Sequence, residues 1–194
     1  MVKEPEIADN DDLSLSTQDW IDAARKMLIS EGIAAVKIDR LAKACDVTRG
    51  GFYWRFRNRD DLHEQLIDHW RATNGAAFHA AVSSPGTPQQ RYKTLIDMWI
   101  DETRFDPQFD NAVRAWAASS EWVADAVHQM DEERIAALTE LFKDGGYQPE
   151  ESFIRARIAY FQQIGYYTLR IRESREERES YSDLYYRIIT GFGE

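Results

Sequence analysis

Apolar positions recur every three or four residues along most of the chain, which is the period of an amphipathic helix. In the first such segment, Trp20, Ala24, Met27 and Leu28 share one face. Similar patterns predict further helices at about residues 38–45, 48–56, 58–78, 89–105, 111–118, 121–143, 150–174 and 179–191. No alternating apolar and polar run is longer than about four residues, so strands are not indicated. The pattern predicts an all-α fold of about nine helices.

Start and stop signals support the first four helices. Ser16 has the side chain of an N-cap, and Gly32 follows the last periodic residue of the first helix. Asp46 occupies the tight turn between the second and third helices, where left-handed backbone is needed. Thr48 is expected to cap the third helix and Asn58 the fourth. Two short helices joined by a tight turn are the plan of a helix-turn-helix.

Charge is distributed unevenly around this motif. The whole chain has a formal net charge of -10, yet residues 14–60 hold nine Lys or Arg against six Asp or Glu. Residues 1–13 hold one base against five acids, and residues 61–194 hold 14 bases against 23 acids. The stretch 47–59 contains four arginines, four aromatic residues and no acid. A basic segment in an acidic protein indicates contact with phosphate, confined to the N-terminal domain.

The third helix offers candidates for reading bases. Thr48, Arg49 and Gly51 lie on its N-terminal, outward part, and Arg49 is the candidate for a bidentate contact to guanine, although a solvated arginine is the alternative. Gly50 and Gly51 each cost about 1 kcal/mol of helix propensity, which suggests close approach of DNA or simply a weak helix. Phe52 is expected in the core, as is Phe56 one turn later.

Other classes of site have little support in the sequence. Cys45 is the only cysteine and lies on an apolar face, where a small buried residue is expected. The four histidines lack metal-ligand spacing, and we see no nucleophile–base pair, phosphate loop or cofactor motif. No apolar run reaches the roughly 18 residues that span a bilayer. The expectation is a cytoplasmic protein that is not an enzyme and has no cofactor, metal or membrane partner.

Aromatic residues of the C-terminal region suggest a ligand pocket between helices. The candidates share helical spacing and size, and they are Met98, Trp99, Phe105, Trp116, Trp122, Tyr160, Phe161 and Tyr167. Aromatic residues at this spacing also form plain core, so a filled interior is the alternative. Arg114, Arg157 or Gln162 would supply the polar anchor, and the sequence does not choose among them.

The last two predicted helices carry apolar stripes suited to pairing with a second copy of the chain. Their candidate interface residues are Ile154, Ile158, Gly165, Leu169, Leu184, Tyr185 and Ile188. Gly165 within a long helix permits close approach of a partner helix. Packing of these residues within one chain is the alternative.

The N-terminal motif resembles a known family. Gly32, the Ile-Asp-Arg-Leu-Ala run 38–42, the run 47–56 and the Asn-Arg-Asp-Asp-Leu run 58–62 are similar in order and spacing to TetR/AcrR-type transcriptional regulators. Two positions depart from the family pattern: Lys37 replaces the usual Ser or Thr at the start of the second helix, and Asp46 replaces the usual turn glycine. The resemblance covers about a quarter of the chain.

The resemblance implies further roles at matching positions. Tyr53, Trp54, Arg55 and Arg59 would donate to DNA phosphates, as would Lys37 or nearby helix amides, and Arg40 is a further backbone candidate. The implied domains are an acidic disordered tail at 1–13, a DNA-binding domain at 14–61 and a ligand-binding and dimerisation domain at 62–194.

The implied function is that of a homodimeric repressor, which binds double-stranded DNA at a palindromic operator and is released by a small-molecule effector. A DNA-binding structural or adaptor protein with a filled core is the alternative.

Overall fold

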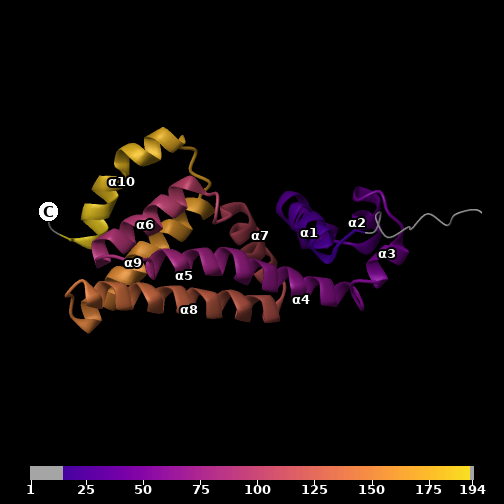
Figure 1. Ribbon diagram of the computed structural model, residues 1–194, viewed down its shortest axis with the longest axis horizontal. Coiled ribbons are helices and arrows are strands. Elements are labelled where there is room, and N and C mark those ends of the chain that lie inside the picture. The colour runs from indigo at the N-terminus through magenta and orange to yellow at the C-terminus, as the bar shows by residue number, and fades with distance from the viewer. Residues whose placement is uncertain (1–14, 193–194) are drawn as a thin grey trace, which may run out of the picture. The chain divides into compact units, whose positions relative to one another are not determined.

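The computed structural model describes residues 15–192, and every regular element within that range is a helix (Figure 1). The predicted all-α fold is therefore confirmed. The acidic tail expected at 1–13 lies outside the described residues. The chain divides into two compact units, an N-terminal unit that ends at Leu66 and a C-terminal unit that begins at Ile67. The domain limits taken from the sequence stay predictions.

The N-terminal unit is built from short helices around a small aromatic core. Its elements are α1 (Thr17–Glu31), a 3-10 turn (Ile33–Ala35), α2 (Ile38–Ala44), α3 (Arg49–Tyr53) and the start of α4 (Arg59–Trp70). Trp20 of α1 meets Phe52 of α3 edge to face, with ring centroids 5.4 Å apart. Phe52 stacks in turn on Phe56 at 4.9 Å, and all three rings are buried. This core fixes α3 against α1, and the predicted burial of Phe52 and Phe56 is confirmed.

Local hydrogen bonds explain where α1 begins and ends. Ser16 Oγ accepts from the Asp19 backbone N–H at 3.2 Å, and the Asp19 carboxylate accepts from the Ser16 backbone N–H at 2.8 Å. The two bonds satisfy amides that the first helical turn leaves free. Gly32 follows the helix with a φ of 81°, in the region that favours glycine. Both predicted signals are confirmed.

The turn between α2 and α3 differs from the prediction in one respect. Asp46 has a φ of 55°, so the left-handed turn position is confirmed. Thr48 precedes α3 in an extended conformation, but its side chain accepts no hydrogen bond from the helix, so the predicted cap is wrong. Asn58 does cap the next helix, accepting from the Asp61 backbone N–H at 2.9 Å.

The C-terminal unit continues the helical chain. After α4 come a π-helical turn (Arg71–Gly75), α5 (Ala76–Val82), α6 (Pro88–Asp101), α7 (Pro107–Ala117), α8 (Glu121–Asp144), α9 (Pro149–Thr168) and α10 (Arg175–Thr190). The helix predicted at 58–78 thus runs from 59 to 82 and contains a π turn that the sequence does not reveal. The long helices α8 and α9 pack against each other, and α7 packs on α8.

The predicted start of α7, end of α9 and start of α10 are wrong, and the two starts are wrong because their caps were overlooked. α7 begins at Pro107 instead of about 111, since the Asp106 carboxylate accepts from the backbone N–H groups of Gln108 and Phe109 at 3.0 Å each. α9 ends at Thr168 and α10 begins at Arg175. There, Ser174 and Glu177 form a capping box like that of α1.

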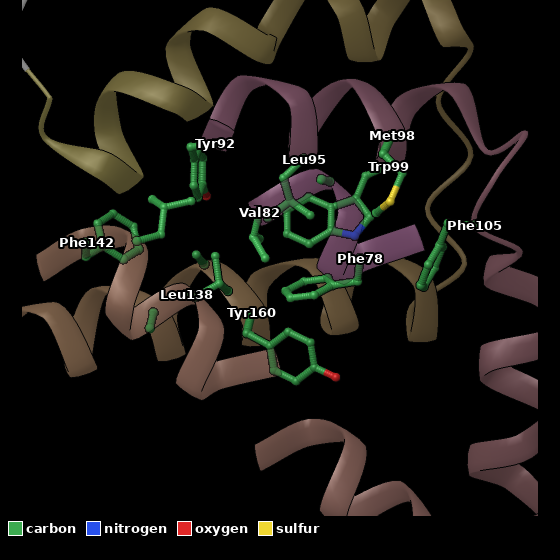
Figure 2. Close-up of a cluster of buried hydrophobic side chains, with 14 of the residues drawn as sticks. Phe78, Val82, Tyr92, Leu95, Met98, Trp99, Phe105, Leu138, Phe142 and Tyr160 are labelled. Carbon is green, nitrogen blue, oxygen red and sulfur yellow. The ribbon is translucent and has the colours of Figure 1, made fainter. Parts of the chain in front are cut away.

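The core of the C-terminal unit is an apolar cluster between α5, α6, α8 and α9. Figure 2 shows Phe78 and Val82 of α5 facing Leu95 and Trp99 of α6, with Tyr160 nearby. Each of these side chains is buried. No helix among residues 15–192 is long and apolar enough to cross a membrane.

Candidate functional site

The surface around α3 carries exposed aromatic and basic side chains. The two phenylalanines of this stretch point inward instead. Phe52 and Phe56 are buried, so the intervening residues face outward. Tyr53 is 54% exposed and Trp54 is 86% exposed. An indole left in water to this extent is unusual, and such residues mark binding surfaces. We call Thr48, Arg49, Tyr53, Trp54 and Arg55 the α3 surface.

Arg49 is exposed at the start of α3 but is not free. Its Nε lies 2.8 Å from Asp39 Oδ1 of α2, and both side chains are mostly solvent-exposed. An exposed ion pair of this kind stabilises the fold by only about 0–1 kcal/mol. Arg49 can therefore leave Asp39 for a base edge at small cost. Asp39 could not be predicted as the partner of Arg49 from the sequence, since neither its residue type nor its spacing marks it.

The two glycines of α3 are not required by the fold. Neither has a positive φ. A methyl group on Gly50 would meet Thr48 Oγ1 at 3.5 Å, and one on Gly51 would meet Trp20 at 3.9 Å, both ordinary contact distances. The helix therefore tolerates alanine at both positions, which leaves close approach of a partner molecule as an explanation for glycine.

The other predicted DNA-contact residues are all exposed. Lys37 precedes α2, where its side chain makes no cap, and Arg40 pairs with Glu31 of α1 through 2.9 Å contacts. Arg55 Nε donates to the Leu15 carbonyl at 3.2 Å, and Arg59 lies 3.9 Å from Asp60. These basic groups lie on the same unit as the α3 surface.

Two further residues of the N-terminal unit are more exposed, or better placed for binding, than the sequence indicates. Cys45 is only half-buried, so the expected fully buried position is wrong, and partial burial raises the pKa of its thiol. Arg57 was given no role by the sequence analysis, yet its side chain is 79% exposed beside Asp61. Its place in the stretch 47–59 makes it a further candidate for phosphate contact.

The structure brings five of the eight predicted pocket residues into one core and leaves three outside it. Met98, Trp99, Phe105, Tyr160 and Tyr167 belong to the buried cluster of Figure 2. Trp116 is buried elsewhere, edge to face with Trp122, which is 44% exposed. Phe161 is 51% exposed, because it follows the inward-facing Tyr160 by about 100° around α9.

A buried charged network lies beside this core. The Asp110 carboxylate accepts from Arg114 Nε at 2.8 Å, Trp70 Nε1 at 3.0 Å and Arg134 Nη1 at 3.2 Å. Arg114 also pairs with Asp131, and Tyr160 donates to Asp131 at 2.6 Å. Arg114, one of the predicted polar anchors, is therefore engaged in holding α7 to α8.

The electrostatics of the network favour the ionised state. Burial by itself raises the pKa of the Asp110 carboxyl, but the guanidiniums of Arg134 and Arg114 outweigh it, so its pKa lies below the ordinary value. Arg134 is stacked over the rings of Trp70, Phe78 and Phe105 at 5.5–5.8 Å. Burial raises the pKa of Tyr160 to about 12, so its hydroxyl stays protonated and donates.

A cavity does occur in the C-terminal unit, at a place that the sequence analysis did not single out. It lies between α6, α9 and α10, has a volume of about 60 Å³ and is partly open to solvent. Trp99 and Gln162 line it, so one predicted aromatic residue and one predicted anchor do meet there. The third candidate anchor, Arg157, instead lies over the rings of Phe153 and Phe161.

Apolar side chains are exposed along α9 and α10. Those at predicted interface positions are Ile154, Ile158, Leu169, Leu184, Tyr185 and Ile188. Gly165 is partly exposed, and no atom lies within 4 Å of the position that its Cβ would occupy. The alternative of packing within one chain does not account for these side chains, because they remain exposed in the single chain.

These features define a class of protein: all-helical, with a helix-turn-helix unit followed by a larger helical unit. Residues 21–66 match the family model described as "Bacterial regulatory proteins, tetR family". The HTH-type transcriptional regulator AcrR of Shigella flexneri is 33% identical over 87 residues, 44% of this chain and 40% of the relative. The chain thus aligns with less than half the length of that relative.

Solved structures extend the likeness in fold to about nine tenths of the chain. The reduced form of E. coli NemR has a TM-score of 0.71 at 16% identity, covering 92% of this chain and 97% of the other. The TetR-family regulator SCO4454 of Streptomyces coelicolor has a TM-score of 0.70 at 22% identity, covering 90% and 92%. Residues 21–66 therefore match the tetR family model, and the chain beyond them shares the fold of these solved structures.

Proposed function

We propose that the protein is a transcriptional regulator that binds a palindromic DNA operator as a homodimer and represses transcription until a small molecule releases it. The observation that carries the proposal is the α3 surface, where Tyr53 and Trp54 stand exposed over a buried aromatic core. A helix presented in this way fits the major groove, and the surrounding donors fit phosphates.

The roles proposed for the α3 surface follow from chemistry and position. Arg49 leaves Asp39 to contact guanine, while Thr48 and Gly51 bring the helix close to the base edges. Tyr53, Trp54, Arg55 and Arg59 donate to phosphates, with Lys37 and Arg40 supporting the second helix. Base contacts give sequence preference, and phosphate contacts give affinity and register.

Dimerisation is proposed through α9 and α10. An isolated recognition helix buries too little surface for selective binding, and two copies at a fixed spacing overcome this limit. The exposed Ile154 and Ile158 of α9, with Leu184 and Ile188 of α10, repeat at helical spacing and form continuous stripes. Burying such stripes against a second copy contributes about 25 cal/mol for each Å².

Release by a small molecule requires that the effector prefer one arrangement of the helices. Side chains fill the buried core of Figure 2, so this core leaves no room for an effector. Taken alone, it favours the alternative of a structural DNA-binding protein without a ligand. The cavity between α6, α9 and α10 favours a ligand-responsive regulator instead.

Selection of bound duplexes from a random DNA pool tests the proposal. The expected product is an inverted repeat with half-sites about one helical turn apart. Failure to enrich any sequence, or enrichment of sites without two-fold symmetry, contradicts the proposal.

Variants then separate base contacts from phosphate contacts. Arg49→Ala is expected to lose discrimination at one base pair of each half-site, worth about 1–3 kcal/mol. Arg59→Ala is expected to weaken binding to all duplexes and to reduce the salt slope by about one. Arg104→Ala, which removes the same charge from an exposed position in the C-terminal unit, serves as the control. If Arg104→Ala and Arg49→Ala behave alike, the role assigned to Arg49 is wrong.

A further inference from the structure

The middle of α10 lies over a gap. The cavity of about 60 Å³ between α6, α9 and α10 is lined by Ile96, Trp99, Gln163, Tyr166 and Tyr185 among others. A second cavity of about 230 Å³ adjoins it between α6 and α10, and the two share Ile96 and Ser182. Among all residues of α10, only Thr190 is buried. Tyr186 packs against Tyr92 of α6, with ring centroids 6.0 Å apart, but the rest of the middle of α10 leaves space where the cavities lie.

Hydrogen bonds hold α10 mainly at its two ends. At its start, Arg178 donates to the Trp99 carbonyl and to Glu102, each at 2.6 Å. At its end, Tyr147 Oη donates to the Thr190 carbonyl at 2.7 Å, and Arg155 donates to the Ile189 carbonyl at 3.1 Å. A guest can therefore occupy the space under residues 182–186 while both ends stay attached.

Gln163 supplies a polar group that points to a ligand. Its side chain is only 8% exposed and lines the cavity, yet its Nε2 has no hydrogen-bond partner among the described protein atoms. Buried donors are rarely left unpaired, since they lose their bonds to water on folding. An oxygen acceptor placed in the cavity would satisfy this amide.

The other residues that line the cavity favour a neutral, planar ligand. The Arg178 guanidinium already binds Glu102 and the Trp99 carbonyl, and the Glu173 carboxylate accepts from Tyr166 Oη at 3.1 Å. With the charged groups engaged, the lining offers aromatic and aliphatic surface plus the amides of Gln162 and Gln163, and the Nε2 of Gln163 is the unpaired one. Such a lining suits an aromatic molecule with a carbonyl oxygen.

We propose that the space between α6, α9 and α10 binds a neutral, planar, largely apolar molecule whose carbonyl oxygen accepts a hydrogen bond from Gln163 Nε2. As the effector site, it rests on the proposed function. Tyr185 lines the cavity and is also exposed on the proposed dimer surface. Occupancy therefore alters the surface through which two copies pair, which links binding to the spacing of the recognition helices.

The site is tested with the aromatic ketone prodan, whose fluorescence reports burial of its ring and hydrogen bonding of its carbonyl. The full chain is titrated with the dye in the absence of DNA. Ile96→Trp, which fills the cavity from α6 without removing Gln163, is expected to abolish binding. Gln163→Leu is expected to weaken it about tenfold, the effect of one lost hydrogen bond. Gln108→Leu, at an exposed position of α7, is the control and is expected to bind as the wild type does.

A second measurement guards against variants that fail to fold. Gln163→Leu removes an unpaired buried amide, so the dye-free variant is expected to melt at or above the wild-type temperature. A wild-type chain that does not bind prodan, or equal binding by wild type and Ile96→Trp, overturns the proposed site.

Measurements with the selected duplex distinguish the two proposals. Dye binding without any sequence-selective DNA binding contradicts the proposed function and leaves the cavity as a ligand site. Selective DNA binding without dye binding contradicts the cavity and leaves the DNA-binding function. When both occur, saturating dye is expected to lower operator affinity at least fivefold, and unchanged affinity overturns the effector role.

Discussion

Replacing Asp110 with asparagine tests whether the buried network holds the C-terminal unit together. The Asp110 side chain is 2% exposed and accepts from Arg114, Trp70 and Arg134. Asparagine keeps the shape but removes the negative charge and replaces one acceptor oxygen with a donor. Arg134 already has unpaired Nε and Nη2 atoms, so the variant leaves its buried charge without a counter-ion in direct contact.

The expected loss is large because both partners are desolvated. Removing one member of a buried ion pair costs about 3–5 kcal/mol. In a unit of this size, that loss lowers the midpoint of thermal unfolding by about 10–15 °C. Asp144→Asn breaks the Arg91–Asp144 pair, in which Asp144 is 56% exposed, and is expected to cost less than about 1 kcal/mol.

Urea unfolding followed by circular dichroism measures both variants. The pKa of the Asp110 carboxyl is lowered in the folded protein, so its contribution to stability is present at neutral pH and is lost as the pH falls through that lowered pKa. The gap between wild type and Asp110→Asn is therefore expected to persist at pH 5 and to close only in stronger acid, below about pH 4. Equal stability of Asp110→Asn and Asp144→Asn at pH 7 would refute this reasoning.

Three further substitutions test separate parts of the structure. Gly50→Ala is expected to stabilise the N-terminal unit by about 1 kcal/mol yet weaken operator binding, and weaker folding in urea would contradict the space available at Gly50. Asp46→Gly is expected to stabilise the protein by about 1 kcal/mol, because glycine adopts the φ of 55° without the steric clash of a Cβ atom. An unchanged urea midpoint would show that Asp46 is not strained in this turn. Ile158→Asp is expected to convert a dimer into a monomer in sedimentation velocity, whereas the variant Ile171→Asp, at another exposed isoleucine that lies outside α9 and α10, is expected to stay dimeric. If the Ile158→Asp variant remains dimeric, α9 is not part of the dimer interface.

Features set by a few neighbouring residues could be predicted from the sequence. The capping box of Ser16, the stop at Gly32 and the left-handed turn at Asp46 each depend on local backbone geometry and side-chain type. Burial of Phe52 and Phe56 was predictable from their spacing of four residues, although α3 ends at Tyr53 and Phe56 lies in the turn after it. The Ser174 capping box uses the same kind of local signal, but the start predicted for this helix, about residue 179, lies beyond the observed start at Arg175.

Features that depend on packing between distant segments could not be predicted. The sequence marks Trp116 and Phe161 as aromatic at helical spacing, but only the arrangement of helices decides that Phe161 faces outward. The contact of Arg134 with Asp110 joins α8 to α7, and no spacing rule connects them. The cavity beside Gln163 is lined by residues of α6, α9 and α10, and no single helix reveals it.

The affinity of the full chain for its selected operator, compared with a scrambled duplex of the same length and composition, tests the central claim most directly. Fluorescence anisotropy at one fixed, near-physiological salt concentration gives both values, as salt changes each of them strongly. A regulator that reads bases through the α3 surface is expected to prefer its operator by about a thousandfold or more, with two chains on each duplex. Equal affinity for the two duplexes would contradict the claim that this surface reads DNA sequence.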